Sequence, residues 1–88
     1  SVSADTTLDG THSFVAVDAT AAARVITLPA AAGIVGRRYT IKKTDSSGNT
    51  VTIDGNGAET IDGAATKVIS TQYTSHSLIS TGSAWFIE

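Results

Sequence analysis

The 88-residue sequence has no cysteine, no methionine and one proline, and only 6% of its residues are aromatic. The absence of cysteine excludes disulfides and fits synthesis in a reducing compartment. A chain of this length forms one domain with a modest hydrophobic core. Its stability must therefore come from side-chain packing, a metal or partner subunits.

Basic charge and long apolar runs are also scarce. Six Lys and Arg residues stand against eight Asp and Glu residues, which gives a net charge of −2 at pH 7. Because nucleic-acid grooves need a basic stripe, we expect no nucleic-acid partner. No apolar run approaches the ~20 residues of a membrane span, so we expect no membrane insertion. Serine and threonine are abundant instead, at 24 of 88 positions, and this composition favours strands.

Short alternating segments bounded by turn residues follow one another along the chain. We interpret residues 1–10 as a lead-in segment and residues 11–88 as a single β-domain. Turn signals recur roughly every 8–12 residues, which is typical of antiparallel sandwiches and barrels. The sequence therefore predicts an all-β fold, a small antiparallel β-sandwich or barrel of about seven short strands. These strands are expected at residues 11–19, 24–28, 39–42, 50–53, 65–71, 73–80 and 84–88.

Three local features of this pattern can be stated in advance. Phe14 and Val15 are apolar on opposite faces of their strand, which predicts a strand covered on both sides. Residues 39–42 and 50–53 alternate around the turn sequence DSSGN and predict a β-hairpin. The sequence AAAG at residues 30–33 suggests a single helical turn capped by Gly33.

The sequence VTIDGNGAETIDG, residues 51–63, is dense in glycine and acidic residues. An EF-hand loop that starts at Asp54 fails, since Ala58 stands at the third ligand position and Glu59 stands where glycine belongs. A phosphate-binding loop needs Lys-Ser or Lys-Thr opening a helix, and neither follows. Asp-Gly and Asn-Gly are strong turn signals, so we predict two tight turns with Ile61 packed into the core between them.

No arrangement of residues predicts catalysis. Asp54, Glu59 and Asp62 could supply a glycosidase carboxylate pair, but they lie in turns with no sign of a cleft. Ser83 lacks the flanking glycines of a nucleophile elbow. We therefore predict a non-enzymatic protein with no catalytic, cofactor-binding or metal-binding residues, and a receptor-binding residue cannot be named.

The basic residues Arg37, Arg38, Lys42 and Lys43 are open to two interpretations. They could meet an anionic surface such as a phosphorylated polysaccharide. The favoured interpretation is that charged side chains protect an edge strand against edge-to-edge pairing. Lys42 and Lys43 are expected to point to opposite faces, so the four residues do not make one patch.

The two histidines and the tryptophan are also read as structural. His12 and His76 are far apart in the sequence and lack the usual short-range zinc spacing. His76 is in phase with Leu78 and is expected to face inward or toward another subunit. Trp85 and Tyr39 are expected to pack in the core or in a subunit contact rather than stack on a sugar.

Residues 25–88 resemble a recurrent module of tailed-bacteriophage fibre, spike and related virion proteins. The shared pattern begins with an apolar strand that ends in Thr-Leu-Pro, an Ala-rich turn, and Gly36 before a Tyr-x-Ile-Lys strand. It continues with Val-Thr-Ile, a Gly-rich turn, Thr-Ile-Asp-Gly, a Leu-Ile-Ser strand and Gly-Ser-x-Trp. His76 departs from the pattern, which has an apolar residue there more often.

This resemblance implies a small antiparallel β-domain, usually trimeric, on a virion appendage or on the capsid surface. The expected function is that of a virion structural module of a phage fibre or spike that contributes to host attachment as a homotrimer. Its expected partners are other virion structural proteins and host cell-surface polysaccharide. Two alternatives remain: a capsid decoration or fibre-assembly module that binds no receptor, and a carbohydrate-binding module attached to an enzyme.

Overall fold

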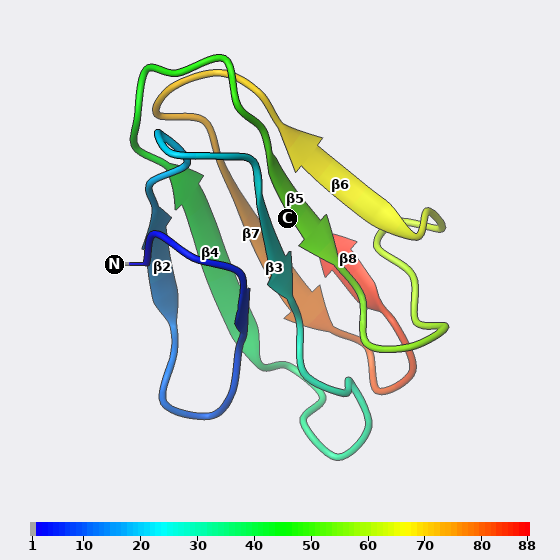
Figure 1. Cartoon of the computed structure of the whole chain (residues 1–88). Helices are drawn as coiled ribbons and strands as arrows, with labels where there is room; N and C mark the ends of the chain where they lie inside the picture. Colours follow the sequence, from blue (N-terminus) through cyan, green and yellow to red (C-terminus); the bar gives the residue numbers. More distant parts are fainter. Residues whose placement is uncertain (1) are drawn as a thin grey trace.

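The computed structural model describes residues 2–88, which form eight short strands and no helix. The strands lie in two four-stranded sheets with the orders β1-β3-β5-β6 and β2-β4-β7-β8 (Figure 1). The all-β prediction is confirmed, and none of the described residues belongs to a helix that could span a membrane. The bounds are β1 (Thr6–Thr7), β2 (Phe14–Val17), β3 (Arg24–Thr27), β4 (Arg38–Lys43), β5 (Val51–Asp54), β6 (Thr66–Ile69), β7 (Ser75–Ser80) and β8 (Trp85–Ile87).

The two sheets are mixed, so the prediction of an antiparallel fold is wrong. β1 pairs with β3, β3 with β5, and β2 with β4, all in parallel. The pairs β5–β6, β4–β7 and β7–β8 are antiparallel. The reason is the path of the chain, which alternates between the sheets from β1 to β5. Each strand therefore returns beside the strand two places earlier, and runs in the same direction.

The predicted hairpin of residues 39–53 is also wrong. Both strands form, as β4 and β5, but they belong to different sheets. The alternation of Tyr39 and Ile41, and of Val51 and Ile53, marks the buried face of each strand correctly. Alternation does not identify the neighbouring strand, and the connection between β4 and β5 is long enough to cross from one sheet to the other.

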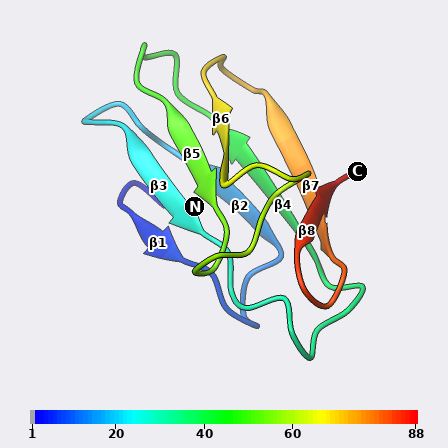
Figure 2. The ribbon, with the colours of Figure 1, turned by 90° about the vertical axis from the view of Figure 1, so that its right-hand side faces the viewer.

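Figure 2 shows the two sheets as two layers, and the hydrophobic core contains side chains from both of them. Tyr39 and Trp85 are its largest members, and their rings meet edge to face with centroids 5.7 Å apart. Of the two places expected for these residues, the core and a subunit contact, the structure shows the core. The other buried apolar residues are Leu8, Val15, Val17, Ala19, Ile26, Leu28, Ala31, Ile41, Val51, Ile53, Ile61, Ile69 and Leu78.

Three further local predictions can be compared with the structure. Strand β2 is covered on one side only, because Val15 is buried whereas Phe14 is exposed. Residues 30–33, AAAG, do not form the predicted single turn of helix. They form a tight turn in which the Ile34 N–H donates to the Ala31 carbonyl at 3.3 Å. The residues interpreted as a lead-in contribute β1, the strand beyond the seven expected, and the buried Leu8.

Candidate functional site

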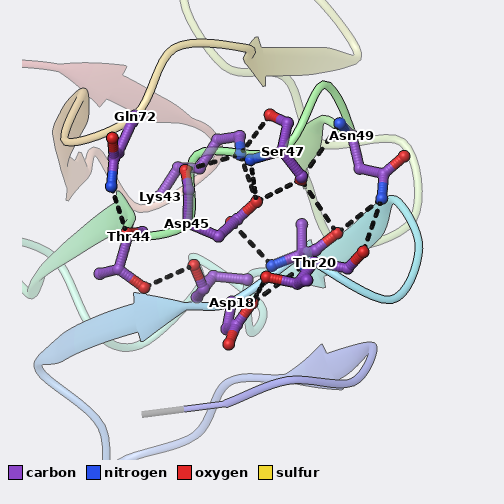
Figure 3. Close-up of polar contacts among 10 residues, drawn as sticks. Asp18, Thr20, Lys43, Thr44, Asp45, Ser47, Asn49 and Gln72 are labelled. Carbon is purple, nitrogen blue, oxygen red and sulfur yellow. Dashed lines mark hydrogen bonds and ion pairs between the residues drawn. The ribbon is translucent and has the colours of Figure 1, made fainter.

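The most elaborate polar arrangement in the molecule surrounds Lys43, at the end of strand β4 (Figure 3). Strand β4 alternates between outward and buried positions, and Lys43 falls on the buried side in phase with Tyr39 and Ile41. Its side chain is fully buried. A buried ammonium group is stable only when it is paired and hydrogen-bonded, so its partners decide what it does.

All three N–H donors of the Lys43 ammonium find acceptors nearby. Nζ donates to the Asp45 carboxylate at 2.7 Å, to the Asp45 carbonyl at 3.1 Å and to the Ser47 carbonyl at 3.2 Å. The ion pair is almost completely removed from solvent. The loop after β4 therefore wraps around the ammonium group and leaves none of its protons for a substrate.

The Asp45 carboxylate is equally well occupied. Its Oδ1 accepts the Ala19 N–H at 2.8 Å, and its Oδ2 accepts the Ser47 N–H at 3.1 Å and the Ser47 hydroxyl. The hydrogen bond from Lys43, followed by the one from the Ser47 hydroxyl, holds the pKa of the Asp45 carboxyl well below its usual range. The group therefore stays ionised at neutral pH, and donors of this chain occupy both of its oxygens.

A second ring of hydrogen bonds connects this loop to the β2–β3 connection. The Asn49 side chain donates to the carbonyls of Ala19 and Thr20, at 2.8 and 3.2 Å. The Thr44 hydroxyl donates to the Val17 carbonyl at 3.1 Å, and the Gln72 amide donates to the Thr44 carbonyl at 3.1 Å. We call the residues Lys43, Asp45, Ser47 and Asn49 the Lys43 cluster. It fixes the point where the chain crosses between the sheets.

Sequence reasoning missed the Lys43 cluster because it grouped Lys43 with its basic neighbours. The signal was present in the alternation of β4, which places Lys43 in phase with two apolar residues. An aspartate two residues later, in a loop with small polar residues, supplies the partner that a buried lysine requires.

The four basic residues separate as expected, because Lys42 and Lys43 lie on opposite faces of β4. Arg37 stacks over the Tyr39 ring and donates to the His12 carbonyl, and Arg38 pairs with Glu88 at 2.5 Å. Lys42 points outward, with its ammonium 5.4 Å from the centre of the Tyr73 ring. The prediction that this strand is a protected edge is wrong, because β4 lies between β2 and β7.

Two of the three acidic side chains in residues 51–63 bind backbone N–H groups of this chain. The Glu59 carboxylate accepts the Ala31 N–H at 3.0 Å, and the Asp62 carboxylate accepts the Ile87 N–H at 3.0 Å. These bonds hold the turn after Pro29 and the outer edge of β8. Asp54, Glu59 and Asp62 are the carboxylates that could have supplied a glycosidase pair. Two of them, Glu59 and Asp62, instead hold segments of the fold together.

The same stretch contains the predicted turns. Asp62 and Gly63 both have positive φ, 51° and 84°, and the backbones of Ile61 and Ala64 exchange two hydrogen bonds across them. This is the geometry of a type I′ turn, which favours Asp-Gly. Ile61 is 1% exposed, which confirms its predicted place in the core.

The two histidines do not come together. His12 Nδ1 accepts the Asp9 N–H at 3.1 Å within one loop. His76 lies half-buried on β7 opposite Ile41, and burial, helped by the charge of Lys67, lowers the pKa of His76. Across residues 2–88 no group of three or more metal-ligating side chains is present, and no pocket is found.

The remaining large apolar side chains lie on the surface. Phe14 and Phe86 are 58% and 54% exposed, and they occupy the two edge strands of the sheet β2-β4-β7-β8. Their chain neighbours Val15 and Trp85 are buried, so both phenylalanines project from the outward side of this sheet.

No protein-family model and no curated protein matches the chain.

Proposed function

We propose that the protein is a non-enzymatic structural module of a tailed-phage fibre or spike, in which it forms a homotrimer and contributes to host-surface attachment. In this proposal the two sheets form a β-sandwich. The observation that supports the proposal best is the pair of exposed phenylalanines, Phe14 and Phe86, on one outward sheet surface. A small domain with a thin core gains stability when partner subunits cover such side chains.

The placement of the two phenylalanines suits a cyclic assembly. Strands lie about 4.8 Å apart, so the edge strands β2 and β8 are separated by about 14 Å across the sheet. Between them the outward surface carries Thr40 and Ser77, whose hydroxyls are 2.9 Å apart, and the longer side chains Arg38 and Ile79. Three copies around an axis would bring the outward surface at β2 of one copy against the outward surface at β8 of the next. Phe14 of one copy would then contact Phe86 of its neighbour.

Attachment would follow from the number of copies rather than from a deep site. A trimer presents three equal surfaces, and several fibres on one virion multiply them, so weak contacts add up to firm adhesion. A shallow surface without a pocket fits weak binding of this kind. The partners would be other virion structural proteins and host cell-surface polysaccharide, and the protein would be located in the virion.

One observation favours the alternative of a capsid decoration or fibre-assembly module. The outward side of the other sheet also exposes apolar residues, Val25 at 38% and Val68 at 49%. Both lie in register with Thr52, so they share one row across that sheet. A decoration protein needs a second surface against the shell, besides the one that joins its own copies, and this row could provide it.

Sedimentation velocity at micromolar concentration tests the trimer. We expect the protein to sediment as a trimer and the Phe14→Ser/Phe86→Ser variant as a monomer. Val68→Ser, which removes an exposed apolar side chain from the other sheet, is the matched control and should remain trimeric. A monomeric wild-type protein would overturn the assembly proposed here.

Binding measurements distinguish attachment from decoration. The assembled protein is applied to an array of host glycans and to intact host cells. Binding that is lost in the monomeric variant supports attachment through multivalency. A trimer that binds neither glycans nor cells contradicts attachment and favours decoration, which is then tested by adding the trimer to purified capsids.

A further inference from the structure

The dipeptide Asn56-Gly57 occupies an exposed turn that none of the roles described above explains. The turn is closed by the Glu59 N–H, which donates to the Asn56 carbonyl at 2.9 Å, and Gly57 has a φ of +56°. Both residues are exposed. A methyl group placed on Gly57 would meet no atom within 4 Å, so the space around its backbone is open.

Among the described residues, the Asn56 carboxamide and the Gly57 N–H are not held by hydrogen bonds. Within residues 2–88, the Asn56 carboxamide makes no hydrogen bond, and the Gly57 N–H donates to no backbone carbonyl outside the strands. Glycine has no side chain to shield its nitrogen, and its backbone is the most adaptable of all residues. A carboxamide and the following backbone nitrogen can therefore approach each other.

We propose that Asn56 is a site of spontaneous self-modification by deamidation. The Gly57 nitrogen attacks Cγ of Asn56, a new N–Cγ bond forms, and the Cγ–Nδ2 bond breaks. The Gly57 amide proton passes to the departing nitrogen, which leaves as ammonia, and a five-membered succinimide remains. Water then adds to one of the two ring carbonyls and opens the ring, giving aspartate or isoaspartate. Water is the single co-reactant, and no atom changes its oxidation state.

The other asparagine of the chain provides an internal comparison. Asn49 donates from its side chain to two carbonyls of the β2–β3 connection, and it is half-buried. The next residue, Thr50, is β-branched and accepts the Arg24 N–H at 3.0 Å. Attack on Asn49 would require these bonds to break and a crowded nitrogen to move. The fold thus holds one asparagine in place and leaves the other free.

The two products have different consequences for the structure. In isoaspartate the main chain runs through the former side chain, which adds one carbon, and the former Asn56 carbonyl becomes part of a free carboxylate. The turn hydrogen bond from Glu59 cannot keep its geometry. Glu59 also holds the Ala31 N–H through its carboxylate, so the turn after Pro29 should loosen as well. Aspartate keeps the original chain path and should change the fold little.

Peptide mapping by mass spectrometry tests the proposal. The full chain is incubated at neutral pH and physiological temperature, folded in one sample and in concentrated urea in another. We expect Asn56 to convert in the folded sample at a rate close to that in urea, whereas Asn49 converts measurably in urea alone. An intact Asn56 in the folded sample, or equal conversion of the two asparagines, would overturn the proposal.

Variants separate the chemistry from its structural effect. Gly57→Ala keeps the amide but hinders the attacking nitrogen, and it should slow the conversion in both samples. Asn56→Asp reproduces one product and should melt like the unaged protein, whereas the isolated isoaspartyl fraction should melt at a lower temperature. An isoaspartyl fraction with an unchanged melting temperature would contradict the link between this turn and Glu59.

Discussion

Replacement of Lys43 by methionine tests the idea that the Lys43 cluster is a structural centre. Methionine is similar in length to lysine and apolar, so the space remains filled while the charge disappears. The change leaves the Asp45 carboxylate buried without a counter-charge. It also removes the donor to the carbonyls of Asp45 and Ser47, which accept from Nζ at 3.1 and 3.2 Å.

The expected loss is large relative to the stability of so small a protein. Removal of one partner of a buried ion pair costs about 3–5 kcal/mol, so we expect a loss of this size for Lys43→Met. The total free energy of unfolding of an 88-residue domain is on the order of 4–13 kcal/mol. In a domain of this size each kcal/mol lowers the melting temperature by roughly 4–8 °C, so Lys43→Met should lower it by roughly 12 °C or more.

Urea titration followed by tryptophan fluorescence measures this effect. Trp85 is the only tryptophan and is fully buried, so its emission reports unfolding of the core. The double variant Lys43→Met/Asp45→Asn keeps the buried acceptor but has no unpaired charge, and it should be more stable than Lys43→Met alone. A loss below about 1 kcal/mol for Lys43→Met, as for a surface substitution, would refute the reasoning. A double variant less stable than Lys43→Met would do the same.

Four further predictions concern stability and association. Ile61→Ala should lower the free energy of unfolding by about 2–5 kcal/mol in the same titration, because Ile61 is 1% exposed. Gly55→Ala should destabilise the fold, since the new methyl would lie 2.3 Å from a backbone oxygen, whereas Gly48→Ala, with no atom within 4 Å, should be nearly neutral by thermal melting. The pKa of the Asp45 carboxyl is lowered in the folded protein, so its contribution to stability is present above the unfolded pKa and is lost as pH falls below about 4. Urea titrations from pH 7 to acid should therefore show a smaller loss of stability for Asp45→Asn than for the wild-type protein. Lys67→Val should increase concentration-dependent association in light scattering, because β6 ends its sheet and an exposed lysine there opposes edge pairing.

The positions of the strands could be predicted, but their partners could not. Alternation of apolar and polar residues identifies β4 and β5, because a strand with one buried face must repeat every second residue. The choice of neighbour depends on whether the intervening loop reverses within a sheet or crosses to the other. That choice is made here by contacts with a distant segment, such as the bond from the Ala19 N–H to Asp45. A local sequence pattern contains no record of such a contact.

The acidic side chains in residues 51–63 also show that a local sequence pattern does not identify contacts with distant segments. Their spacing predicted tight turns rather than a metal or phosphate site, and Asp62 and Gly63 do form a tight turn. Their actual partners, the N–H groups of Ala31 and Ile87, belong to segments that only the folded chain brings near. A carboxylate that caps a backbone N–H is already satisfied and has less capacity to bind a ligand. The recognition proposed for this protein therefore rests on apolar side chains left exposed by the fold, and Phe14 and Phe86 are two of these on one surface.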